Sequence, residues 1–121
     1  MPLDPLASVL SVLSVAEDGD RAAVRFAAGT ALTEANAEAV GGRLAALAAA
    51  QPRPHLTLDL GGVTMLTSVV LAKLISLNGK VRAAGGRLTL TNPTPAVRQV
   101  FRVTRLDTLL DIRTASEALS A

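Results

Sequence analysis

The feature that most constrains the fold of this chain is an alternation between short strand-like segments and longer segments with helical periodicity. Two strand-like segments come first, Val9 to Ala16 and Ala22 to Ala27. The turn-forming run Glu17-Asp18-Gly19-Asp20 joins them, which predicts an antiparallel hairpin. Helical and strand patterns then alternate, and strands joined through helices pair in parallel by right-handed crossovers. The order β-β-α-β-α-β-α-β-α therefore predicts an α/β fold.

The two longest helices are predicted from apolar residues that recur three and four positions apart. The first runs from an N-cap at Thr33 to about Ala50, and Gly29-Thr30 separates it from the hairpin. The second begins at Thr67 or Ser68 and runs to about Ala84. Gly85-Gly86 ends it, because a residue in the left-handed conformation commonly follows a helix.

Capping signals predict two shorter helices. Thr94 and Pro95 provide an N-cap and a first helical residue, which is a position that Pro tolerates. The run Thr114-Ala115-Ser116-Glu117 matches a capping box and predicts a brief last helix. The remaining strands are expected at His55 to Leu60, Arg87 to Thr91, and Leu109 to Ile112. Gly61 to Leu66 is expected to be a connection.

These elements predict one domain that spans residues 1–121. Its mixed, mostly parallel sheet has four to five strands, an antiparallel hairpin at its N-terminal edge and about four helices.

The composition excludes several classes of function. The chain has no Cys and a single His, so thiolate metal sites, multi-histidine metal sites and Cys nucleophiles are impossible. That His55 stands at a strand start and is expected to be an ordinary surface residue. A net charge of +2, with no Trp or Tyr, argues against direct nucleic-acid binding. We therefore expect no enzyme, no metal and no cofactor.

Membrane insertion is also not expected. The longest apolar run, Leu44 to Ala50, is far shorter than the roughly 20 residues of a membrane-spanning helix. The segment Leu6 to Ala16 has no basic region before it, so it is interpreted as a strand and not as a signal peptide. The expected location is the cytoplasm.

Two hydroxyl residues stand at a position suited to recognition. Thr67 and Ser68 open the second long helix, where free backbone N–H groups and a partial positive charge favour a phosphate. Plain capping by one hydroxyl is the alternative. No Asp or Glu occurs between Leu60 and Leu106, so this stretch forms either a basic face for an acidic partner or a solvated rim. Its basic residues are Lys73, Lys80, Arg82, Arg87, Arg98, Arg102 and Arg105.

Three segments resemble the STAS domain family, which includes bacterial anti-sigma factor antagonists. The first is Leu58-Asp59-Leu60-Gly61-Gly62-Val63-Thr64-Met65-Leu66-Thr67-Ser68-Val69-Val70-Leu71. The second is Arg82 to Leu90, and the third is Pro95 to Phe101 together with the turn Thr104 to Leu106. The family pattern reads Asp-Ser-Ser/Thr-Gly at the start of the second helix, and Ser68 matches the Ser that a partner kinase phosphorylates. Thr67, Val69 and Val70 depart from that pattern.

The resemblance implies an anti-sigma factor antagonist that works by partner switching. Its partner would be an anti-sigma factor or a serine kinase of the anti-sigma type, and phosphorylation of Ser68, with Thr67 as a secondary site, would break the contact. The expected partner-binding residues are Thr33, Thr67, Ser68, Val69, Val70, Leu71 and Lys73. Two alternatives stay open. One is a non-phosphorylated STAS scaffold or regulatory subunit of a signalling or lipid-transport complex, and the other is a small-ligand or nucleotide sensor.

Overall fold

The chain begins with the predicted antiparallel hairpin. A computed structural model describes residues 13–19 and 21–113. Strand β1 (Leu13–Asp18) pairs with β2 (Arg21–Phe26), and Asp18 lies opposite Arg21. Glu17 and Asp18 therefore belong to the strand and not to the turn, because the cross-strand pairing continues through them. The predicted start of this strand, residues 9–12, lies outside the described residues.

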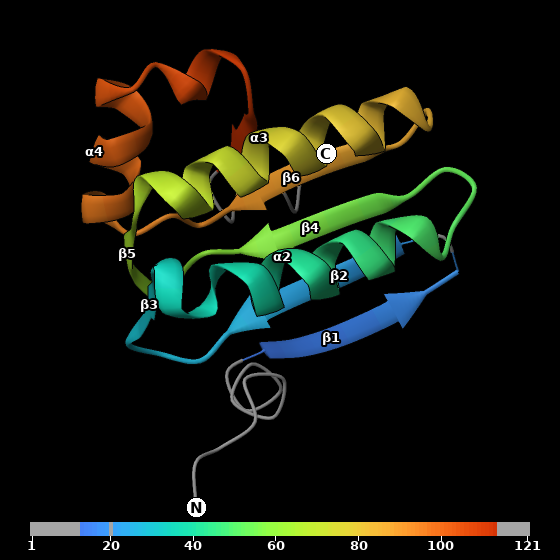
Figure 1. Ribbon diagram of the computed structural model, residues 1–121, viewed down its shortest axis with the longest axis horizontal. Helices are drawn as coiled ribbons and strands as arrows, with labels where there is room; N and C mark the ends of the chain where they lie inside the picture. The colour runs from blue at the N-terminus through green and yellow to red at the C-terminus, as the bar shows by residue number, and fades with distance from the viewer. Residues whose placement is uncertain (1–12, 20, 114–121) are drawn as a thin grey trace, which may run out of the picture.

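The main sheet has five strands in the order β1-β2-β4-β6-β7 (Figure 1). Strands β4 (His55–Asp59), β6 (Arg87–Thr91) and β7 (Asp111–Arg113) extend the hairpin, and every pairing from β2 onward is parallel. The predicted α/β fold, with a mostly parallel sheet and an antiparallel hairpin at its edge, is confirmed.

The described residues contain three α-helices and one 3₁₀ turn. They are α2 (Glu34–Ala49), α3 (Ser68–Ala83), α4 (Pro95–Val103) and η1 (Leu106–Thr108). Helices α2 and α3 lie side by side over one face of the sheet, while α4 lies near its end (Figure 1). The structure thus has three described helices where about four were predicted, and the brief helix expected at residues 114–117 lies outside the described residues.

Two short strands were not predicted. The region around Thr30 was interpreted as a break and Gly61 to Leu66 as a connection. The structure has β3 (Thr30–Leu32) and β5 (Val63–Leu66), which pair in parallel as a separate two-stranded sheet. Strands of three and four residues are too short to show a periodic pattern, so pairing between distant segments decides their conformation.

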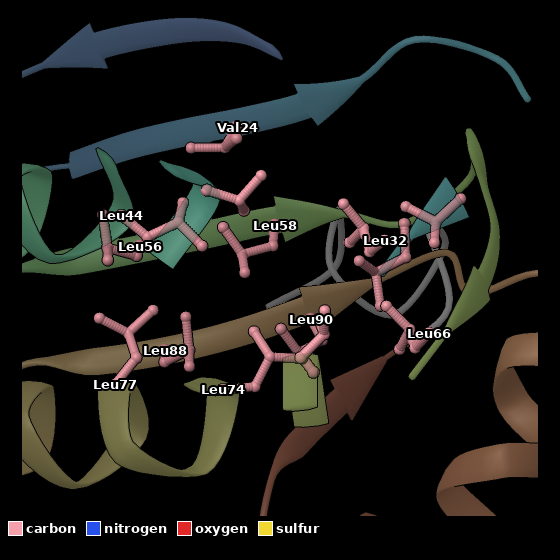
Figure 2. Packing of buried hydrophobic residues seen from close by; sticks show 14 of the residues in the cluster. Val24, Leu32, Leu44, Leu56, Leu58, Leu66, Leu74, Leu77, Leu88 and Leu90 are labelled. Carbon is pink, nitrogen blue, oxygen red and sulfur yellow. The ribbon is translucent and has the colours of Figure 1, made fainter. Parts of the chain in front are cut away.

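The core lies between the main sheet and helices α2 and α3 (Figure 2). Alternate residues of each central strand face it, as the period of two requires. Leu58 and Leu90 are fully buried, and α2 and α3 contribute Leu44 and Leu74. Residues on the other side of the same strands are polar, for example Thr57 and Thr89.

Gly85 and Gly86 end α3 in the predicted way. Gly85 has a φ of +79°, and the N–H of Gly86 donates to the carbonyl of Val81 over 2.9 Å. The chain then passes so close to Pro54 that a Cβ at Gly86 would collide with the carbonyl oxygen of Pro54. Gly86 is therefore required by a backbone contact that fixes the start of β6 against β4.

Replacing Gly86 by Ala should destabilise the domain, whereas Ala at the helical Gly79 should not. A Cβ at Gly79 meets no atom within 4 Å. We expect Gly86→Ala to lower the free energy of unfolding by about 1–3 kcal/mol through overpacking. Gly79→Ala should raise it by roughly 0.5–1 kcal/mol through helix propensity. Urea denaturation of both variants measures the difference, and an unchanged stability for Gly86→Ala would contradict the close contact.

A small charge cluster fixes β7 at the edge of the sheet. Asp111 accepts from Arg87 at 2.7 Å and from Arg113 at 3.1 Å, and the hydroxyl of Thr89 also donates to it. Partial burial raises the pKa of Asp111, but the hydrogen bonds from Arg113 and Arg87 outweigh it, so the pKa lies below its ordinary value of 3.8. The folded state therefore favours the charged carboxylate.

The contribution of Asp111 to stability should depend on pH. Because its folded pKa is lowered, its contribution is present above the unfolded pKa and disappears as the pH falls through the folded pKa. We expect Asp111→Asn to lower the free energy of unfolding at neutral pH by about 1 kcal/mol or less, as for partly exposed ion pairs. This deficit should shrink below roughly pH 4. Urea denaturation at several pH values tests it, and Asp107→Asn, at an exposed position of η1, is the control that should show no such trend.

Candidate functional site

The candidate site is built by the pairing of β3 with β5. Leu32 lies opposite Leu66 in this parallel pair, so the next residues of both strands, Thr33 and Thr67, leave the pair side by side. The N–H of Thr67 donates to the carbonyl of Leu32 over 3.1 Å. Since Thr33 is the N-cap of α2 and Thr67 is the N-cap of α3, the first turns of both helices are adjacent.

The N-terminus of α4 is attached to the same short sheet. The hydroxyl of Thr94 donates to the carbonyl of Val63 over 3.1 Å and accepts from the N–H of Val97. Three helices therefore begin at one end of the main sheet (Figure 1). Each helix N-terminus carries a partial positive charge, so this end of the molecule favours anions and acidic side chains. We call the surface formed by Thr33, Met65, Thr67, Ser68 and Val69 the N-terminal corner.

At α2, the capping groups of the corner are fully used. The Thr33 hydroxyl accepts from the N–H of Ala35, and the N–H of Thr33 donates to the side-chain oxygen of Asn36 over 2.9 Å. The amide nitrogen of Asn36 also donates to the carbonyl of Ala31. These bonds hold the first turn of α2 rigid and confirm the predicted N-cap.

At α3, the two hydroxyls differ from each other. The Thr67 hydroxyl is buried and has no hydrogen-bond partner in the part of the chain that the structure describes, so it does not cap the helix as the plain capping interpretation required. Ser68 is the first residue of α3 and its side chain is exposed. Of the two, only Ser68 offers its oxygen to another molecule.

The structure divides the predicted partner-binding residues into exposed and buried groups. Val69 is 38% exposed, whereas Val70 and Leu71 are 4% and 7% exposed and pack in the core. Val70 and Leu71 therefore support the corner from below and offer no surface. Met65, 47% exposed on β5, lies beside this group and was not predicted. Recognising β5 as a strand would have indicated that Met65 is exposed, but a strand of four residues is too short to recognise from the sequence.

Lys73 points away from Ser68. Its ammonium group binds the Glu38 carboxylate of α2 at 2.6 Å, and its side chain passes over Gly41. The hydrogen bond and charge of Lys73 lower the pKa of Glu38. Lys73 is thus held in a bridge between the two helices. In the basic stretch of the sequence, Arg87 is likewise held by Asp111.

The described residues contain no group of three or more potential metal-ligating side chains. His55 stands at the start of β4, as the sequence predicted, and it is half-buried where an ordinary surface residue was expected. In the part of the chain that the structure describes, no helix is long and apolar enough to cross a membrane.

Comparison with known families identifies the class of domain. Residues 15–111 match the model of the family described as "Mlab, STAS domain". The match begins within β1 and ends at the first residue of β7, so it includes the corner and most of the five-stranded sheet. The chain therefore belongs to the STAS domain family.

Solved structures of antagonists share this fold. A STAS domain anti-sigma-factor antagonist from Planctomyces limnophilus is 20% identical, with a TM-score of 0.76 over 88% of this chain and 94% of that one. An anti-sigma factor antagonist from Mycobacterium paratuberculosis is 24% identical, with a TM-score of 0.75 over 89% and 90%. The Bacillus protein SpoIIAA in its phosphorylated form is 17% identical, with a TM-score of 0.65 over 89% and 96%. SpoIIAA has also been solved unphosphorylated. A comparison with curated proteins gave no match.

Removing the unpartnered hydroxyl of Thr67 should stabilise the domain. A buried hydroxyl without a partner keeps its desolvation cost, so the near-isosteric Thr67→Val should raise the free energy of unfolding by about 1 kcal/mol. Thr94→Val is the matched control, because that hydroxyl makes two hydrogen bonds at the N-cap of α4. It should lower the free energy of unfolding by about 1 kcal/mol. Thermal and urea denaturation measure both, and a destabilised Thr67→Val would show that its hydroxyl has a partner.

Proposed function

We propose that the protein is a cytoplasmic, non-enzymatic anti-sigma factor antagonist that binds an anti-sigma factor, or a serine kinase of the anti-sigma type, through its N-terminal corner. The observation that carries this proposal is the exposure of Ser68 and Val69 at the end of the main sheet where α2, α3 and α4 all begin (Figure 1). Membership of the STAS family supports it, as do the printed descriptions of the solved structures above.

The corner has the apolar surface that a protein partner needs. Met65 and Val69 are large side chains that face solvent, and Ile75, 37% exposed, lies two turns further along α3. Between them, Ala72 and Ser76 are exposed and uncharged. A solvent-facing helix surface normally carries charged residues, so an uncharged surface joined to exposed apolar side chains favours docking of another protein.

Phosphorylation of Ser68 would control this docking. A phosphate adds about −1.5 to −2 charges and would be stabilised locally by the N–H groups of the first turn of α3. It would also place that charge in the middle of the apolar corner, where it would oppose a contact made without it. Burial of its hydroxyl makes Thr67 the poorer substrate of the two. The two solved forms of SpoIIAA, phosphorylated and unphosphorylated, are consistent with such a switch.

A second candidate uses the same corner without modification. In a scaffold or regulatory subunit, the exposed Met65 and Val69 would bind a partner permanently. The family's acidic residue before the phosphorylated Ser is replaced by Thr67 in this chain, which favours this alternative. The two functions share a surface and differ only in whether charge at Ser68 controls it.

The test combines phosphorylation with partner affinity. The unmodified protein is incubated with a histidine-kinase-like anti-sigma factor and ATP, and the modified residue is located by mass spectrometry. Affinity for the same partner is then measured by isothermal titration calorimetry. We expect phosphate on Ser68, unchanged affinity for Ser68→Ala, and affinity weakened about tenfold or more for Ser68→Asp.

Ser14→Asp is the matched control, because it adds the same charge at an exposed position of β1, an outer strand of the main sheet that contributes no residue to the corner. It should bind as the unmodified protein does. If Ser68→Asp bound the partner as tightly as the unmodified protein and no phosphate were found, the phosphorylation switch would be ruled out and the scaffold function would remain. Loss of affinity from Ser14→Asp and not from Ser68→Asp would place the docking surface elsewhere and overturn both candidates.

A further inference from the structure

A cleft separates α2 from α3 above the sheet. It has a volume of about 260 Å³, and its floor is made of core side chains. Those from the helices include Val40, Leu44, Leu74 and Leu77, and Leu58 comes from β4. These floor residues are at most 5% exposed, so the floor of the cleft is part of the core.

The cleft continues along both helices. A second cavity of about 300 Å³ lies toward their C-terminal ends, against Pro54 and Ala84. The two cavities share Ala45, Leu77 and Lys80 as lining residues. The two cavities therefore adjoin along the side-by-side helices α2 and α3 (Figure 1), and we call them together the groove.

Small residues keep this groove open between the two helices. Gly41, Gly42 and Ala45 line it from α2, and Ser76 lines it from α3. A Cβ at Gly41 would lie 3.2 Å from the Cδ of Lys73, so the side chain of Lys73 already reaches across at that point. An α-helix is about 10 Å wide, so even two turns of a helix occupy more volume than either cavity offers. An unbranched alkyl chain is small enough for these volumes and matches the apolar floor.

The rim of the groove carries positive charge. Lys80 lines both cavities, is exposed, and forms no ion pair among the described residues. Lys73 also stands at the rim, but Glu38 neutralises it at 2.6 Å. Lys80 is thus the cation available to an anionic group at the point where the two cavities meet.

We propose that this groove binds an amphiphile with a single alkyl chain and an anionic head, of the fatty-acid class. The chain would lie between α2 and α3 on the leucine floor, and the carboxylate would lie at Lys80. The site is separate from the N-terminal corner and does not depend on the function proposed for it.

The test uses decanoate, below its micelle concentration, as the probe. Ala45→Leu fills the point where the two cavities meet, and Ala46→Leu is the matched control, since Ala46 is exposed and lines neither cavity. Both positions lie in α2, and Leu has nearly the helix propensity of Ala. By calorimetry we expect saturable binding of decanoate, an affinity weakened about fivefold or more by Ala45→Leu, and little change with Ala46→Leu.

The head group is tested with Lys80→Gln and with decanol. Decanoate should bind more tightly than decanol to the unmodified protein, and Lys80→Gln should remove that difference. Should Ala45→Leu fail to fold, hydrogen exchange on the unmodified protein decides: protection by decanoate confined to α2 and α3 supports the site. Absence of saturable binding, equal effects of the two Leu variants, or protection elsewhere would overturn it.

Discussion

The organisation of this molecule depends on the parallel pairing of two very short strands. Backbone hydrogen bonds join Thr30 to Gly62 and Thr67 to Leu32, and the Thr94 hydroxyl attaches α4 to β5. Neither strand could hold its conformation alone, because an isolated pair of short strands is barely stable in water. Burial of Leu32 and Leu66 against the core provides the missing stabilisation. The pair in turn fixes where α2, α3 and α4 begin, so the position of every group in the N-terminal corner follows from it.

The same constraint produces the groove between the helices. Helices α2 and α3 both have 16 residues and begin side by side, so they must run along the sheet as neighbours. How closely they approach then depends on the residues that face each other. Because Gly41 and Ala45 present little side chain to α3, the Lys73–Glu38 bridge spans the gap near the start and leaves space beyond it. The proposed docking surface and the proposed binding groove can therefore coexist on one small domain, with Ser76 at the boundary between them.

Most of the fold could be predicted from the sequence because its elements carry local signals. The caps at Thr33 and Thr94 and the glycines after α3 define helix ends through bonds within a few residues. The strands β3 and β5 could not be predicted, since their conformation depends on a partner about 30 residues away. The site was predicted only in part for a related reason. Periodicity separates the buried Val70 from the exposed Ser68, but the burial of Leu71 and the turning of Lys73 toward Glu38 depend on tertiary neighbours.

The pairing of Lys73 also determines how a phosphate on Ser68 would act. The ammonium group of Lys73 binds Glu38 on the neighbouring helix α2 and does not contribute to the first turn of α3. The phosphate would then be held by the backbone N–H groups of the first turn, which are already oriented by the Thr67–Leu32 bond. Such binding needs no rearrangement of the helix. A modification at this position would therefore change the charge that a partner meets while leaving the fold as it is, which is what reversible control of a docking surface requires.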